Sequence, residues 1–203
     1  HILLNLSKEK KSFRALKREK SSLHITKKIF DHYNASKLFE DIEWIKGDIL
    51  DIPSLEESLE LCDQVIHAAA MVSFHSEDVK EMYKINVEGT ANVMNVSLSS
   101  NIQKVCYISS IAALGRNNTN KIIDEECYFT PSNKENNYST SKYYAEQEVW
   151  RAAQEGLNVV ILNPSVILGP GDWNKGSSQI FQRSNQGLKY YTTGSTGYVD
   201  VID

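Results

Sequence analysis

Short apolar runs separated by longer helical stretches are the feature of this sequence that most restricts its fold. The runs lie at residues 12–16, 42–46, 64–69, 104–109 and 158–163. Their length fits strands that are buried on both faces of a parallel sheet. Between Glu77 and Leu98, apolar residues recur every three or four positions, as on one side of a helix. The alternation of strands and helices predicts an α/β fold with a doubly wound parallel sheet covered by helices.

Net charge, cysteine spacing and the length of the apolar runs indicate which kinds of partner to expect. The formal net charge of −4 provides no basic surface field of the kind that holds nucleic acid. Cys62, Cys106 and Cys127 lie far apart, without the spacing of a zinc site or a disulfide framework, so we expect no metal and a cytoplasmic location. No apolar stretch approaches the roughly 18 residues of a membrane span, so we expect no membrane partner.

The segment YSTSK, from Tyr138 to Lys142, is the sharpest chemical signal. Residues four apart share one face of a helix, at about 5–6 Å between Cβ atoms. A free phenol has a pKa of about 10, and a nearby ammonium lowers it toward the range of a general acid or base. The same spacing also occurs in exposed helix pairs without chemical function. Here, however, the run at 104–109 leads into Ser109 and Ser110 at the carboxyl edge of the predicted sheet, where open α/β sheets bind ligands.

In their order and amino-acid sequence, these segments resemble the extended short-chain dehydrogenase/reductase family, also called the NAD-dependent epimerase/dehydratase family. The resemblance covers essentially the whole chain and is strongest to the dihydroflavonol-reductase-like and hydroxysteroid-dehydrogenase-like branches. It implies a catalytic set of Ser110, Tyr138 and Lys142 that serves hydride transfer between a nicotinamide and a carbonyl or alcohol. Ser109 is the alternative serine, because successive strand residues face opposite sides. The match to the second serine of the family's pair favours Ser110.

The resemblance also implies a Rossmann-like sheet, whose first strand lies centrally and is followed by a glycine-rich loop for the pyrophosphate. Neither precedes His1 in this sequence. A sheet without its central strand would leave two rows of backbone groups unpaired. We therefore expect residues 1–168 to form a dinucleotide-binding domain whose first strand and glycine loop lie outside this sequence, and residues 169–203 to begin a substrate-binding region.

Several cofactor contacts are implied by the same resemblance. Ala68, Ala69 and Ala70 follow the third apolar run, where small residues let the backbone approach the cofactor. Asp48 matches the family's adenine-binding aspartate, and Ile49 would pack on the ring. Core packing is the alternative for Ala68, and a local backbone cap is the alternative for Asp48.

The family's nicotinamide pocket is matched by Pro164 and Ser165, which we expect to contact the cofactor together with Tyr138 and Lys142. Asn163 stands where the family usually has an arginine, so any contact made by that arginine is in doubt. Asn86 resembles the helix asparagine that supports the active-site lysine.

Cofactor preference is predicted from the segment RALKREK at the end of the first apolar run. A 2′-phosphate needs cations, whereas NAD-preferring relatives place an acid there. Arg18 matches the family's phosphate-binding arginine, and guanidinium groups bind phosphate bidentately. The prediction is NADP, with NAD as the other possibility and a solvated basic turn as the alternative for Arg18.

Two other functions stay open at this point. A nucleotide-sugar epimerase or dehydratase with retained NAD would use the same Tyr138 and Lys142 pair. A non-catalytic nucleotide-sensing protein on the same fold is the second alternative, because a fold does not fix a function. We expect a small-molecule substrate and a homodimer, since the helix after Tyr138 resembles one that pairs subunits in many family members.

Overall fold

The computed structural model describes residues 1–115, 122–131, 136–187 and 196–203. Its contacts divide the chain into two units, Asp48–Pro164 and the combination of His1–Gly47 with Ser165–Asp203. These limits do not coincide with the boundary expected between residues 168 and 169, which remains a prediction. Each unit is described by itself.

A parallel three-stranded sheet forms the centre of the Asp48–Pro164 unit. Its order is β3 (Gln64–His67), β4 (Lys104–Ile108) and β5 (Val159–Leu162). The register places Val65 and Val159 on either side of Val105. Because side chains alternate along a strand, this row and the row of Tyr107 share one face of the sheet.

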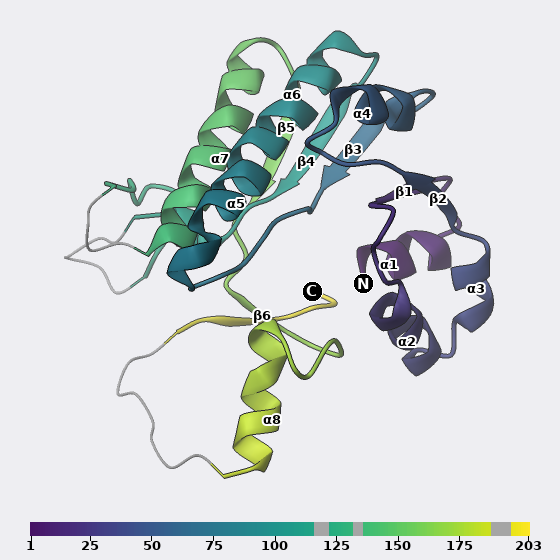
Figure 1. The fold of residues 1–203 in the computed structure, drawn as a ribbon, viewed down its shortest axis with the longest axis vertical. Helices are drawn as coiled ribbons and strands as arrows, with labels where there is room; N and C mark the ends of the chain where they lie inside the picture. The colour runs from purple at the N-terminus through teal and green to yellow at the C-terminus, as the bar shows by residue number, and fades with distance from the viewer. Residues whose placement is uncertain (116–121, 132–135, 188–195) are drawn as a thin grey trace. The chain divides into compact units, whose positions relative to one another are not determined.

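Helices cover that face (Figure 1). They are α4 (Ile52–Leu59), α5 (Val79–Tyr83), α6 (Gly89–Ser99) and α7 (Asn137–Gln154). Val93 and Met94 of α6 and Val149 of α7 join Val105 and Tyr107 in one buried cluster. Their burial supplies the main stabilisation of this unit, since removing apolar surface from water is the dominant favourable term in folding. The opposite face carries Ile66, Val160 and Leu162, each nearly half exposed.

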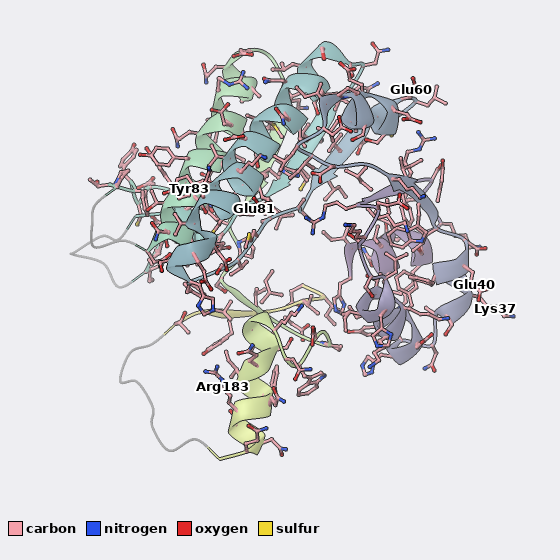
Figure 2. The ribbon with its side chains drawn as sticks, viewed as in Figure 1. Lys37, Glu40, Glu60, Glu81, Tyr83 and Arg183 are labelled. Carbon is pink, nitrogen blue, oxygen red and sulfur yellow. The ribbon has the colours of Figure 1, made fainter. Side chains whose placement is uncertain are left out.

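The other unit contains two pairs of parallel strands. β1 (Arg14–Lys17) pairs with β2 (Glu43–Lys46), beside α1 (Ile2–Lys8), α2 (His24–His32) and α3 (Ser36–Glu40). A cluster around the fully buried Phe30 packs these elements together. Figure 2 shows Lys37 and Glu40 on the solvent side of α3. β6 (Val166–Leu168) pairs with β7 (Tyr198–Asp200), and α8 (Gln179–Asn185) lies between them in sequence.

The predicted strands are all present, although each is shorter than its apolar run. The single helix expected from Glu77 to Leu98 is interrupted. A 3₁₀ turn at Ser76–Asp78 precedes α5, and a π-helical turn, η2 (Lys84–Glu88), separates α5 from α6. The turn η2 contains the buried side chain of Asn86. Periodicity alone did not reveal this interruption, because one extra residue hardly disturbs spacings of three and four.

Candidate active site

The strands β3, β4 and β5 end at one edge of their sheet, and the candidate residues follow directly. Ser109 and Ser110 come after β4, and a 3₁₀ turn at Ile111–Ala113 then packs against α7. This packing brings the end of β4 to the helix that carries Tyr138 and Lys142.

The start of α7 is fixed by its own capping residue. Asn136 accepts a hydrogen bond at Oδ1 from the Ser139 backbone N–H, at 2.8 Å. Within the first turn, Ser141 Oγ donates to the carbonyl oxygen of Tyr138 at 2.8 Å. Capping satisfies helix N–H groups that otherwise lack a partner. The backbone at Tyr138 is thereby held in a defined first turn.

Tyr138 is half-buried and interacts with the predicted serine. Burial raises the pKa of its phenol, and a hydrogen bond with the Ser110 side chain opposes that rise. The exposed ring of Phe74 lies edge-on to the Tyr138 ring, with 6.1 Å between the centroids. The pKa shift has the opposite sign to the expected lowering by Lys142, because burial of the phenol is the largest cause.

The two serines have different surroundings. Ser109 is buried, and its Oγ donates to Glu146 Oε2 at 2.6 Å. Ser110 Oγ accepts from the Ala112 N–H at 3.1 Å and caps the short 3₁₀ turn. The hydroxyl of Ser109 is therefore engaged inside the protein, whereas that of Ser110 is available beside Tyr138.

Lys142 is 1% exposed, which is rare for a lysine. Its Nζ donates to Tyr107 Oη at 2.8 Å and to the carbonyl oxygen of Ile108 at 3.0 Å. Burial lowers the pKa of Lys142 to about 8, and the Glu146 carboxylate opposes that shift. Tyr107 was not among the predicted site residues. Its place two residues after Val105, on the inward face of the strand, is the sequence signal that identifies it.

Two further polar side chains, His67 and Thr90, lie near Tyr107 and Lys142. His67 is buried with its Nε2 at 3.0 Å from Thr90 Oγ1, and its ring centroid is 5.4 Å from that of Tyr107. Burial, together with the charge of Lys142, lowers the pKa of His67 to about 3, so the imidazole is neutral near pH 7. Burial also raises the pKa of Tyr107. His67 and Tyr107 are thus both uncharged near neutral pH, and Lys142 carries the positive charge beside them.

Asn86 joins the loop after β3 to the catalytic helix. Its Oδ1 accepts from the Met71 N–H at 2.7 Å, and its Nδ2 donates to the Met71 carbonyl at 3.0 Å and to Ser141 Oγ at 3.0 Å. Asn86 thus contacts Ser141, the residue that precedes Lys142 on α7, and its support of Lys142 stays a prediction. The loop between β3 and Met71 consists of Ala68, Ala69 and Ala70, which are all exposed.

The other predicted cofactor-binding residues of this unit contact nearby protein groups. Asp48 Oδ1 accepts from the Leu50 N–H at 3.0 Å, as in the capping alternative. Ile49 is buried in the core, and a Cβ added at Gly89 would lie 2.5 Å from its Cδ1 atom. The carbonyl of Pro164 accepts from the Ile111 N–H at 3.0 Å.

Arg18 and Ser165 belong to the other unit. Arg18 is exposed in the turn after β1. Its neighbour Arg14 forms an ion pair with Glu43 at 3.1 Å, so Arg18 is the more available guanidinium. Ser165 lies directly before β6, where Gly197 approaches it closely.

Within the described ranges, no helix has the length and apolar character needed to cross a membrane. Nor do three or more His, Cys, Asp or Glu side chains of those ranges gather in a group that could hold a metal ion. The cytoplasmic location, the homodimer and the absence of a nucleic-acid partner stay predictions.

Comparison with known proteins identifies the class and then the family. The parallel sheet, with a serine, a tyrosine and a lysine brought together after β4 and on α7, is that of an extended short-chain dehydrogenase/reductase. More narrowly, the chain belongs to the 3-beta hydroxysteroid dehydrogenase/isomerase family, whose model matches residues 4–201.

Individual relatives agree with this assignment. Cinnamoyl-CoA reductase 1 of Petunia hybrida is 33% identical over 174 residues, which cover 81% of this chain and 51% of the relative. The crystal structure of gox2253 is 30% identical with a TM-score of 0.72, covering 89% of this chain and 52% of that one. The terminal R domain from the myxalamid PKS-NRPS biosynthetic pathway is 22% identical with a TM-score of 0.82, covering 98% and 55%.

At that lower identity, the R domain shows the fold alone. The chain spans about half the length of the relatives it matches. The predicted family, the predicted parallel α/β fold and the prediction of membership in an enzyme family are confirmed.

Proposed function

We propose that the protein is a nicotinamide-dependent oxidoreductase that interconverts a carbonyl compound and an alcohol. The observation that carries the proposal is the grouping of three side chains: Ser110 directly after β4, close enough to Tyr138 to lower the pKa of its phenol, and the buried Lys142 one turn after Tyr138 on α7. The likeness to a cinnamoyl-CoA reductase supports the direction of carbonyl reduction. The exposed Phe74 ring beside Tyr138 favours a substrate with an apolar or aromatic part.

The residues present fit a nicotinamide dinucleotide. An ammonium has three donors, and Lys142 uses two of them for Tyr107 and Ile108, which leaves one for a ribose hydroxyl. The exposed Ala68, Ala69 and Ala70 leave the backbone after β3 open to close approach.

A bound nicotinamide supplies the hydride. When a carbonyl is reduced, the phenol of Tyr138 donates its proton to the carbonyl oxygen, so that one hydride and one proton yield the alcohol. The raised pKa of Tyr138 keeps this proton on the phenol near neutral pH. The Ser110 hydroxyl donates a hydrogen bond to the same oxygen, where negative charge develops. Ser109 is unsuited to this role because its hydroxyl is committed to Glu146.

NADP(H) is the cofactor that we propose. The support is the exposed guanidinium of Arg18 at the end of β1. Steady-state kinetics with both cofactors test the preference, and Arg18→Ala should raise KM for NADPH with little effect on KM for NADH. A lower KM for NADH in the unaltered protein would contradict it.

Substitution of the phenol tests the proposed function. Tyr138→Phe should lower kcat about 10²- to 10⁴-fold, the usual contribution of a general acid or base, and leave NADPH binding nearly unchanged. Turnover is measured as NADPH consumption with a panel of aromatic aldehydes and ketones, and binding as nicotinamide fluorescence. Tyr144→Phe is the matched control on the same helix. Unchanged turnover in Tyr138→Phe would refute the proposal, and NAD that copurifies without net consumption would support an epimerase instead.

A further inference from the structure

Glu146 is a buried carboxylate on α7, one helical turn after Lys142 and two turns after Tyr138. Its side chain is 7% exposed. A carboxylate at such a position is strongly unfavourable unless hydrogen-bond donors and a counter-charge surround it. No motif in the sequence singled out Glu146, and the proposed reaction does not use it.

The donors around Glu146 come from three segments. Ser109 Oγ donates to Oε2 at 2.6 Å, and Asn163 Nδ2 donates to the same oxygen at 2.8 Å. Trp150 Nε1 donates to Oε1 at 3.3 Å from the next turn of α7. Because Ser109 follows β4 and Asn163 follows β5, one carboxylate ties two strand ends to the catalytic helix.

These bonds fix the peptide that carries Ser110. Asn163 Nδ2 also donates to the Ser110 carbonyl at 3.2 Å, and the Ser109 N–H donates to the Leu162 carbonyl at 2.8 Å. With Ser109 held inward, the alternation of extended backbone turns Ser110 to the other side, where it meets Tyr138. Asn163, at the position of the family's usual arginine, thus has a defined role in this chain.

The same carboxylate acts on Lys142. Among the described residues, the titratable groups that interact with Lys142 are His67 on β3, Tyr107 on β4 and Glu146 on α7, and Tyr138 lies one turn before Lys142 on the same helix. The imidazole is neutral, and both phenols keep their protons near neutral pH. Among these four groups, Glu146 supplies the negative charge that offsets the burial of the ammonium.

We propose that Glu146 is a positioning residue for the proposed reaction, holding the Ser109–Ser110 segment and Asn163 against α7 so that the Ser110 hydroxyl meets Tyr138. Its second effect is to maintain the ammonium form of Lys142. The inference rests on the function proposed above, because it assigns Glu146 a part in placing Ser110 and Lys142.

Glu146→Gln in the intact protein tests the role, since it keeps the shape and one acceptor oxygen while removing the charge. Glu148→Gln is the matched control, because Glu148 is on the same helix but forms a partly exposed ion pair with Arg151 at 2.9 Å. Glu146→Gln should lower kcat about 10- to 100-fold with little change in KM, as expected for a displaced catalytic group. Glu148→Gln should retain wild-type kcat.

Nucleotide binding gives a readout that is independent of turnover. NADPH affinity, followed by nicotinamide fluorescence from pH 6 to 10, should fall as Lys142 loses its proton, with a wild-type midpoint at about 8. Removing the opposite charge should move this midpoint down by about one pH unit in Glu146→Gln. A residue that only stabilises the fold would lower the melting temperature without moving the midpoint, and that result would overturn the proposal.

Ser109→Ala provides a second variant if Glu146→Gln does not fold. It removes one donor and keeps the carboxylate, so kcat should fall while the pH midpoint stays in place. The effects of the two changes on kcat should be less than additive, because both act through one hydrogen bond. Wild-type kcat in Ser109→Ala, or in a folded Glu146→Gln variant, would overturn the inference. If Tyr138→Phe loses turnover in the same assay, the proposed function survives that outcome.

Discussion

Lys142 is a buried cation, and burial disfavours its charged form. Full burial lowers its pKa from the usual 10.5 to about 8, so its proton is lost as the pH rises through about 8. Two of its donors are already paired inside the protein, and the proposed contact to a ribose needs the remaining proton. The charge state of this one side chain should therefore set the upper pH limit of activity.

The pH profile of kcat/KM checks this expectation. In the proposed mechanism protonated Lys142 is the active form, so kcat/KM should be constant below about pH 8 and decline above it. The phenol of Tyr138 has a raised pKa, so its ionisation falls at higher pH and is separable. A profile that stays flat up to pH 10 would show that the ammonium form is not required.

At the scale of an element, the start of α7 determines where Tyr138 lies. Asn136→Ala should lower the free energy of unfolding by about 0.5–2 kcal/mol, because the Ser139 N–H loses its acceptor. The variant should also reduce kcat, since Tyr138 lies in the first turn. Asn136→Asp keeps an acceptor at this position and should restore both quantities. Urea unfolding and steady-state kinetics measure the effects, and equal stability of the alanine variant would contradict the role of the cap.

The sequence predicted the strands and the helix that carries Tyr138 and Lys142 because these depend on local patterns. Val65, Val105 and Val159 lie in apolar runs, and the spacing of Tyr138 and Lys142 is visible within five residues. The partners of Lys142 and Glu146 were not predicted. Tyr107 lies in β4 and Ser109 directly after it, more than 30 residues before their partners, and only the packing of α7 on the sheet brings them together.

The cofactor contacts of Asp48 and Ile49 were predicted from the family resemblance, and the structure shows local partners for both side chains. Asp48 uses a carboxylate oxygen for the Leu50 N–H, and Ile49 turns into the core against Gly89. Both follow from the tight turn after β2, where short polar side chains bond nearby backbone. A sequence can suggest that an aspartate bonds nearby backbone. It does not show whether the same side chain contacts a cofactor instead.

At the scale of the whole molecule, the predicted homodimer can be tested at an aromatic row on α5 and α7. The rings of Tyr83 and Tyr144 are 6.5 Å apart, and Tyr143 continues the row to Phe129, with which it stacks at 4.8 Å. Figure 2 shows Tyr83 and Glu81 on α5 at this surface. Tyr144 is 41% exposed, and exposed aromatic groups are enriched at protein interfaces.

Light scattering across a concentration series tests the dimer. The unaltered protein should have twice the mass of one chain, and Tyr144→Glu should shift it to the monomer because a charge enters the apolar contact. Tyr198→Glu is the control, since Tyr198 is 55% exposed but lies on β7. A monomer at every concentration of the unaltered protein would remove the proposal.

The π-helical turn η2 gives the run from Val79 to Ser99 one residue more than continuous α-helical winding requires. Deleting a residue within η2 should therefore leave α5 and α6 on their present faces, so the protein would still fold. The deletion would close the local widening of the backbone that aims Asn86 at Met71 and Ser141. The five residues of η2 could therefore lose one residue without loss of the fold but not without loss of the Asn86 contacts. The extra residue in this turn would then serve to place Asn86 and not to form the helix.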